Sequence, residues 1–378
     1  MKRDTRPFLE KVAKFTEENI LPIAQSVDRE NRCPEELIAP MREAGFFGIP
    51  YPEVYGGSGG DYQTAFEMLR ILSKGSAGIG LLFVVQWMAA DVLLKYGTAY
   101  QKKKYLEDLV SGKKIASYAI SEFAAGSDAA SIKTVAVETE KIWQIKGSKY
   151  FVTNGSLSDL FIVACKGDQD KGMTLFIVER GSKGLSITEK SEKMGFRSSA
   201  TTNLILNCVE VADLQRIGSA ETGMKIALDG LVGGRLGMAA IGVGIAEAAY
   251  EKALEYANKR IAYGKKIGKL YAIQEKVADM HIALESARVL FEKACQSRDK
   301  NRDYSLEASV AKIAAGKAAN KISFEALQVM GGHGYLVQND VERYYRDARL
   351  IDIGVGASEV IKMVIGATVL HKEIGTKA

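Results

Sequence analysis

Apolar side chains recur at helical spacing in the first part of the chain. Residues 8–24, FLEKVAKFTEENILPIA, and 33–49, CPEELIAPMREAGFFGI, both place them every three or four positions, which predicts amphipathic helices. Residues 51–62, YPEVYGGSGGDY, form a glycine-rich loop without the Lys and Ser/Thr of a phosphate-binding loop. Residues 81–97, LLFVVQWMAADVLLKYG, are apolar almost throughout, which predicts a buried helix or a cavity wall. Residues 1–115 are therefore expected to form a helical domain.

The hydrophobic period changes between residues 116 and 218. Short β-branched runs such as DLFIVACKG (159–167) alternate with Gly, Asn and Asp, which predicts an antiparallel β-domain. After residue 220 the helical period returns in four long stretches: 222–259, 268–298, 305–331 and 356–373. They predict a four-helix bundle over residues 219–378. The expected fold class is therefore α+β, with a β-domain between two helical domains.

Composition excludes several classes of protein. The chain has 378 residues, 47% apolar and 26% charged, which is ordinary for a globular protein of two or three domains. The net charge of +5 is modest and the Lys102–Lys104 run reads as a solvated helix face, so nucleic acid binding is not expected. Four widely spaced cysteines and three histidines without ligand spacing argue against disulfides and a metal. With no signal core and no uninterrupted apolar run of about 18 residues, we expect a cytoplasmic protein without a membrane span.

Five sequence blocks carry a resemblance to a known family. They are YAISEFAAGSDAASIKT (118–134), KYFVTNG (149–155), KRIAYGKKIG (259–268), QVMGGHGY (328–335) and RDARLIDIGVGASEV (346–360). Each block alone could be a tight turn, but together, in this order, they resemble the flavin-dependent acyl-CoA dehydrogenase family over the whole chain. The resemblance implies a middle β-barrel domain, FAD as cofactor, a CoA-thioester substrate, an electron-transfer flavoprotein as partner, and a homotetramer built as a dimer of dimers.

The resemblance also implies which residues bind the cofactor. They are Tyr118, Ser121, Gly126, Ser127, Phe151, Thr153, Arg260, Gln274, Gln328, Gly331, Gly332, Ser358 and Glu359. Phe151 takes a position usually held by tryptophan beside the flavin ring, and Thr153 is expected near the flavin N5. Arg260 is expected to bind the FAD pyrophosphate of a neighbouring subunit. An anionic dinucleotide needs a guanidinium and close backbone approach, which Arg260 and the glycine pair at 331–332 can provide.

On the substrate side, the resemblance places Ser127 at the pantetheine arm and Arg235 at the CoA arm. The backbone of the loop with Val355 and Gly356 can donate to the oxygen of a thioester enolate. Val232 stands where many relatives have an acidic residue near the pantetheine, so the CoA contacts there are left open.

The family's catalytic carboxylate is absent from both positions where members carry it. Most members have a glutamate in a Tyr-Glu-Gly-Thr context, which removes the proton next to the thioester. Here the matching residues are GVGA (354–357). A minority carry the base just before an arginine that matches Arg235, and that residue is Gly234. The chain could be inactive, could do flavin chemistry without this base, or could have a relocated base.

Asp91 is the expected relocated base. Its neighbours in FVVQWMAADVLLK are almost all apolar, and in the family this helix lines the acyl cavity. A buried carboxylate without a partner has a raised pKa, which suits a general base. The alternative is an i,i+4 ion pair with Lys95 at a helix surface. Asp352 and Glu122 are rival candidates, each expected to be structural.

A displaced base would reach a different proton. In cyclohex-1-ene-1-carboxyl-CoA the α-carbon has no proton, and the thioester acidifies C3 through the double bond while C6 can give up a hydride. The chain lacks the glutamate at both family positions and has Asp91 in the helix that lines the acyl cavity. In this it resembles the cyclohex-1-ene-1-carboxyl-CoA dehydrogenases of anaerobic aromatic degradation, which form cyclohexa-1,5-diene-1-carboxyl-CoA by 1,4-elimination. The alternatives are a cyclohexanecarboxyl-CoA or short branched-chain acyl-CoA α,β-dehydrogenase, a flavoprotein lyase such as a desulfinase, and a non-catalytic acyl-CoA-binding flavoprotein.

Overall fold

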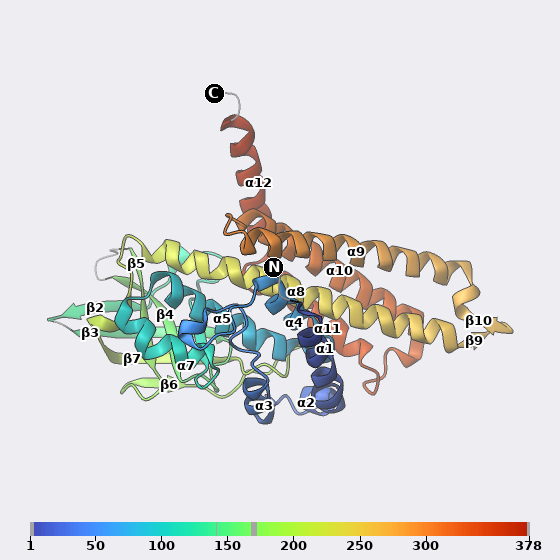
Figure 1. Ribbon diagram of the computed structural model, residues 1–378, viewed down its shortest axis with the longest axis horizontal. Coiled ribbons are helices and arrows are strands. Elements are labelled where there is room, and N and C mark those ends of the chain that lie inside the picture. Colours follow the sequence, from blue (N-terminus) through green and yellow to red (C-terminus); the bar gives the residue numbers. More distant parts are fainter. Residues whose placement is uncertain (1–3, 141, 168–171, 376–378) are drawn as a thin grey trace.

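The computed structural model describes residues 4–140, 142–167 and 172–375 (Figure 1). Its first part is helical: α1 (Arg6–Phe15), α2 (Ala24–Arg29), α3 (Ile38–Glu43), α4 (Tyr62–Gly75), α5 (Ala77–Tyr96), α6 (Ala99–Gln101) and α7 (Glu107–Val110). Asp61 caps α4 by accepting the backbone N–H of Thr64 at 2.8 Å. Helix α5 is buried from Ala77 to Ala90, as its continuous apolar sequence predicts.

The middle part is one eight-stranded sheet. Its strands are β1 (Ala116–Ala119), β2 (Val135–Thr139), β3 (Ile142–Val152), β4 (Leu160–Gly167), β5 (Met173–Glu179), β6 (Leu185–Ile187), β7 (Thr202–Ala212) and β8 (Arg216–Ile217). The strand order is β6-β7-β3-β2-β4-β5-β8, with β1 paired to β4. The predicted antiparallel pattern is wrong at two places, because β4 runs parallel to both β1 and β2. Alternate residues of β4 enter two different cores, so its sequence is apolar throughout.

The last part is a helical bundle. It comprises α8 (Gly223–Lys259), α9 (Tyr271–Asp299), α10 (Ser305–Met330), α11 (Val341–Ile353) and α12 (Ser358–Gly375), with a hairpin of β9 (Ile261–Ala262) and β10 (Lys265–Lys266). The fourth packed helix is α11, whereas the predicted fourth stretch forms α12, which extends away from the body (Figure 1). A Cβ on Gly244 would lie 2.3 Å from the carbonyl oxygen of Arg70, so this glycine allows α8 to lie close against α4.

Among the described residues, two helices, α5 and α8, are long and apolar enough to cross a membrane by length and composition. The bent pair of α11 and α12 would be a third if it counted as one span. In the most apolar windows of α5 and α8, 89% and 72% of the residues are buried inside the protein. Their apolar surface therefore packs against other elements of the same chain.

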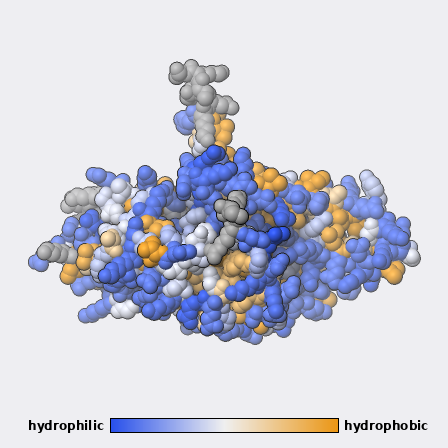
Figure 2. Space-filling model, viewed as in Figure 1, coloured by the Kyte–Doolittle hydropathy of each residue, from blue (hydrophilic) through white to orange (hydrophobic). Residues whose placement is uncertain are grey.

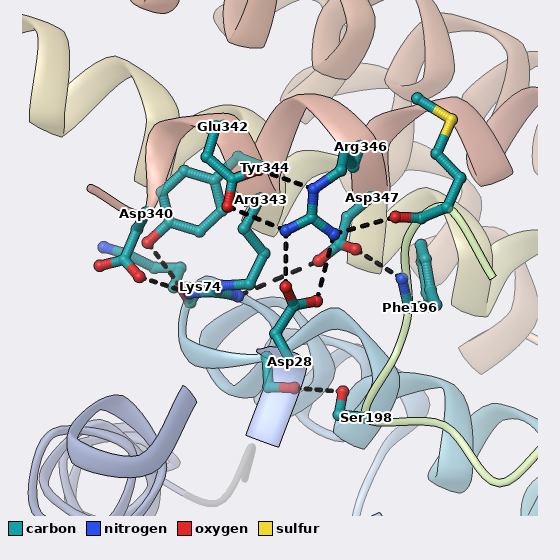
Figure 3. A network of polar contacts seen from close by, with 12 residues as sticks. Asp28, Lys74, Phe196, Ser198, Asp340, Glu342, Arg343, Tyr344, Arg346 and Asp347 are labelled. Atoms are coloured by element: carbon teal, nitrogen blue, oxygen red, sulfur yellow. Dashed lines mark hydrogen bonds and ion pairs between the residues drawn. The ribbon is translucent and has the colours of Figure 1, made fainter. Parts of the chain in front are cut away.

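Helix α11 is tied to both other parts of the chain by a polar network (Figure 3). Arg346 binds the carboxylate of Asp28 in α2 with two N–H groups, at 3.2 Å and 2.5 Å. It also donates to the carbonyl oxygen of Met194, in the segment before β7, at 2.9 Å. Asp347 accepts the backbone N–H of Phe196 from the same segment. These contacts fix the end of α11, from which the loop 354–357 begins.

We expect Asp347 to make the free energy of unfolding depend on pH. Burial raises the pKa of this carboxyl to about 6, despite the opposing effect of Arg343. Because the folded chain holds the proton more tightly than the unfolded chain, stability falls as pH rises from about 4 through 6, by roughly 3 kcal/mol. Asp347→Asn keeps an acceptor for Phe196 but cannot ionise. In urea titrations we expect the mutant to gain about that much relative to the wild type over this pH range. A constant difference between the two proteins would contradict this.

Candidate active site

Asp91 lies in the last third of α5, where its carboxylate meets donors from distant parts of the chain. The hydroxyls of Tyr51 and Tyr62 lie 3.1 Å and 3.0 Å from its Oδ1. Nη2 of Arg298, at the end of α9, donates to Oδ2 and forms an ion pair with it. The Asp91 side chain is 20% exposed. Three donors, one of them cationic, offset the cost of taking this carboxylate out of water.

The Arg298 guanidinium is buried among aromatic side chains. Its Cζ lies 3.5 Å from the ring centre of Tyr62, 5.4 Å from that of Phe66 and 5.2 Å from that of Tyr304. Burial, the largest single effect, lowers the pKa of the guanidinium. The charge of Asp91, the two neighbouring tyrosines and the hydrogen bond to Asp91 together outweigh it, so the pKa lies above its ordinary value. The arginine therefore faces Asp91 with a full positive charge.

One alternative and one expectation about Asp91 are wrong. Lys95, its i,i+4 partner in the alternative, instead donates to Asp229 on α8 at 2.7 Å. Asp91 is also not without polar partners, since its three donors come from outside α5. The loop 51–62 contributes a tyrosine at each end, a role that its glycine-rich sequence does not indicate. A helix sequence shows only its own neighbours three and four positions away, so these donors could not be read from α5 alone.

The two positions that the family resemblance assigns to glutamate lie together. A Cβ built on Gly234 would lie 2.8 Å from Cγ1 of Val355 and 2.7 Å from Sδ of Met88. We call this place the vacant position. Next to it, a Cβ on Gly233 would lie 3.4 Å from Oδ2 of Asp91. Met88 and Asp91 are three residues apart on α5, so the carboxylate stands about one helical turn, roughly 5 Å, from the vacant position.

The loop after α11 brings backbone groups to the vacant position. Val355 has a φ of +53°, in the left-handed region that β-branched residues rarely adopt. Such strain, about 1–3 kcal/mol, persists only where the surroundings hold it. The fully buried Lys312 does so by donating to the carbonyl oxygen of Gly356 at 2.8 Å. Within the described parts of the chain the Val355 N–H has no acceptor, so it is available to a ligand oxygen.

The rival carboxylates have structural partners. Glu122 binds the buried Lys149 at 2.7 Å and accepts two backbone N–H groups from the segment before β2. Asp352 accepts from three side chains, those of Asn320, Arg349 and Ser358. Both hold loops and helix ends in place, as expected for structural carboxylates.

The residues expected to bind FAD divide into two groups, and the first lies on the middle domain. It comprises Tyr118, Ser121, Gly126, Ser127, Phe151 and Thr153. Phe151 is 70% exposed with a φ of +57°, so a strained backbone holds an aromatic face at the surface. Such a face fits the flat ring of a flavin. The Tyr118 hydroxyl donates to the Ala227 carbonyl at 3.2 Å, so this hydroxyl is already used within the chain.

The second group lies at the far end of the bundle. It comprises Arg260, Gln274, Gln328, Gly331 and Gly332. A Cβ on either glycine would meet nothing within 4 Å, and Gly331 has a φ of +55° that favours glycine. Arg260 is exposed and has no acidic partner among the described residues. Open backbone beside a guanidinium fits a pyrophosphate. The β9–β10 hairpin and the sheet lie at opposite ends of the molecule (Figure 1), so the two groups are well separated within one chain.

The remaining predicted residues border the loop and the first bundle helix. Ser358 donates to Asp352 at 2.9 Å, and Glu359 lines a hollow at the start of α12. Arg235 is buried, donates to Ser309 at 3.2 Å, and keeps an Nε without a partner in the described residues. Its guanidinium thus has a donor left for a ligand.

Known proteins of one family match this chain over nearly its whole length. Residues 2–113, 117–209 and 221–370 match the family models described as the N-terminal, middle and C-terminal domains of acyl-CoA dehydrogenase. The chain is 37% identical to a short-chain specific acyl-CoA dehydrogenase of Clostridium acetobutylicum, over 95% of this chain and 96% of that protein. It is 38% identical to a 3-(aryl)acrylate reductase of Clostridium sporogenes, over 94% and 96%. The butyryl-CoA dehydrogenase structure from Megasphaera elsdenii matches with a TM-score of 0.95 at 34% identity, over 98% and 99%.

Proposed function

Because the chain belongs to the acyl-CoA dehydrogenase family of FAD-dependent oxidoreductases, we propose that it dehydrogenates cyclohex-1-ene-1-carboxyl-CoA by 1,4-elimination, with Asp91 as the base. The observation that carries this proposal is the place of the carboxylate. The vacant position has no acid, while Asp91 stands about one helical turn further along α5 with Oδ2 facing Gly233. A base so displaced is suited to a proton further from the thioester than the α-proton.

The proposed reaction follows from this placement. Oδ2 of Asp91 takes the proton from C3, and the electron pair moves through the ring into the thioester, giving a dienolate. The Val355 N–H donates to the thioester oxygen and stabilises its charge. The pair then forms the C1–C6 double bond as a hydride leaves C6, giving cyclohexa-1,5-diene-1-carboxyl-CoA. FAD, when bound, supplies the hydride acceptor, and an electron-transfer flavoprotein is the proposed partner that reoxidises it.

The absence of an α-base also supports the choice of substrate. A saturated acyl-CoA needs a base at its α-carbon, and neither Gly234 nor Val355 can provide one. The relatives include both an acyl-CoA dehydrogenase and an arylacrylate reductase, so similarity at this level is compatible with more than one acyl group. The runner-up is a cyclohexanecarboxyl-CoA or short branched-chain acyl-CoA α,β-dehydrogenase in which Asp91 reaches the α-proton.

The test is anaerobic mixing of the FAD-loaded enzyme with each candidate thioester. We expect cyclohex-1-ene-1-carboxyl-CoA to bleach the flavin absorbance and to yield a conjugated cyclic diene two hydrogens lighter. Bleaching by saturated acyl-CoAs alone would favour the runner-up. Release of a substituent without bleaching would indicate a lyase, and binding without any reaction would indicate a non-catalytic acyl-CoA-binding protein.

We further propose a homotetramer in which each FAD lies between two chains. The two groups of FAD residues lie at opposite ends of one chain (Figure 1). Hydrophobic patches cover the hairpin end, α9 and α12 (Figure 2). They include exposed side chains of Ile261, Tyr263, Ile282, Val289, Met363 and Leu370. Contact between copies would bury these patches.

Arg260→Ala should lower FAD content, because it removes the cation that is proposed to bind the pyrophosphate. It should not unfold the chain, because Arg260 is exposed. We expect at least a tenfold weaker FAD binding, measured by flavin fluorescence on titration into apoprotein. Mixing R260A chains with Phe151→Ala chains should restore part of the flavin sites, since one hybrid interface carries both native groups. No restoration in mixed tetramers would contradict a shared site.

A further inference from the structure

We propose that Arg298 is the positioning residue of the base: it keeps Asp91 ionised and turns Oδ2 toward Gly233 of α8. The inference rests on the proposed function, in which Asp91 takes the C3 proton, and it names a residue on which that base depends.

The hydrogen bonds of Asp91 leave one oxygen for the reaction. The hydroxyls of Tyr51 and Tyr62 both lie within hydrogen-bond distance of Oδ1 and fill the approach to it, although Tyr51 can also donate to the Trp87 carbonyl oxygen at 3.2 Å. Among the residues that the structure describes, Oδ2 accepts only from Arg298 and keeps one acceptor direction. Oδ2 is also the oxygen next to Gly233, where a Cβ would lie 3.4 Å away. The same Cβ would lie 3.1 Å from Nη1 of Arg298, so the glycine lets α8 approach the ion pair closely on the side of the oxygen that can accept a proton.

Among the described residues, Arg298 is the one cation that faces the Asp91 carboxylate. Tyr51, Tyr62 and Tyr304 approach from the loop, from α4 and from the start of α10, and burial raises the pKa of all three hydroxyls. They are therefore neutral donors. The nearby Lys95 is paired with Asp229, and α8 presents only glycine at 233. Without Arg298, Asp91 would be a partly buried carboxylate without a countercharge, which favours the protonated form.

Arg298 is held in place independently of Asp91. Its guanidinium stacks on the Tyr62 ring, with Cζ 3.5 Å from the ring centre. The next residue, Asp299, accepts the backbone N–H groups of Tyr62 and Gln63 at 2.7 Å and 3.1 Å. The end of α9 is thus fastened to the start of α4 by a residue that does not touch Asp91. Asp299→Asn is therefore a matched control, since it weakens the same junction and leaves the ion pair in place.

The experiment compares Arg298→Gln, Arg298→Lys and Asp299→Asn in the FAD-loaded enzyme. The first readout is the pH dependence of flavin bleaching by cyclohex-1-ene-1-carboxyl-CoA in single turnovers. We expect R298Q to move the pH of half-maximal rate upward by roughly one to three units, so that activity lost at neutral pH returns in alkali. R298K should keep the wild-type midpoint with a lower maximal rate. D299N should lower the thermal midpoint and leave the pH profile unchanged.

The second readout does not depend on activity. Infrared difference spectra between each protein and its Asp91→Asn derivative report whether Asp91 carries a proton. We expect no protonated carboxyl band at neutral pH with Arg298 present, and such a band in R298Q. An ionised Asp91 in R298Q, or an unchanged pH midpoint, would overturn the inference while leaving the proposed function intact. Flavin bleaching by the D91N enzyme would instead overturn the proposed function. If R298Q does not fold, Arg298→Met replaces it with the same two readouts, and a pH midpoint unchanged by that substitution overturns the inference.

Discussion

Asp91→Asn should lower the rate of flavin bleaching by cyclohex-1-ene-1-carboxyl-CoA by about 10³-fold, within the usual range for loss of a general base. The amide can still accept from Tyr51 and Tyr62 but has no site that takes a proton at neutral pH. It also leaves Arg298 without a countercharge. Rapid-mixing absorbance under anaerobic conditions measures the rate, and thioester binding should change far less than the rate.

Asp229→Asn is the matched control for this substitution. Asp229 is the carboxylate on α8 that pairs with Lys95, close to Asp91 in the fold but bound to a different cation. Its loss should leave the bleaching rate within a fewfold of the wild type. An Asp91→Asn enzyme that bleaches as fast as the D229N enzyme would show that another group removes the proton.

Val355→Glu should create α,β-dehydrogenation of cyclohexanecarboxyl-CoA, a saturated substrate for which the native chain has no base at the vacant position. The new carboxylate would stand beside Gly234, where the resemblance places the glutamate of relatives. A φ of +53° also suits an unbranched glutamate better than a β-branched valine. We expect at least a 10²-fold gain in bleaching by the saturated thioester.

Gly234→Glu provides the contrast. Its Cβ would lie 2.7 Å from Sδ of Met88 and 2.8 Å from Val355, so side chains must move before the carboxylate fits. This variant should show a lower thermal midpoint and a smaller gain than V355E. If V355E folds, binds FAD and still fails with saturated thioesters, the vacant position is not where the α-proton lies.

The parts of the fold that depend on local period could be predicted, and those that depend on long-range pairing could not. Helix and strand positions follow from the local apolar pattern: the predicted stretches 268–298 and 159–167 form α9 and β4. The parallel pairing of β4 with β1 and β2 is invisible in a strand's own sequence. Likewise α12 has the length and apolar content of a bundle helix, and nothing local shows that it extends away from the body.

The same limit applies to the site. Asp91 stands out because it is the one acid in an apolar helix sequence, which is a local signal. Tyr51 lies 40 residues and Arg298 lies 207 residues away from it along the chain. Neither belongs to a motif, and only the packing of α4, α5 and α9 brings them together. The residues predicted to bind FAD do belong to local motifs, so the sequence identifies them. Only the three-dimensional structure shows that the two groups lie far apart within one chain.

The central claim, that a proton leaves from C3, is tested most directly by isotope substitution at that carbon. The measurement is the anaerobic flavin bleaching rate with cyclohex-1-ene-1-carboxyl-CoA carrying deuterium at C3, compared with unlabelled thioester and with thioester deuterated at C6. We predict slower bleaching with either label, and loss of deuterium from C3 in the diene product. Bleaching at the unlabelled rate from the C3-deuterated thioester, with its deuterium fully retained in the product, would contradict 1,4-elimination.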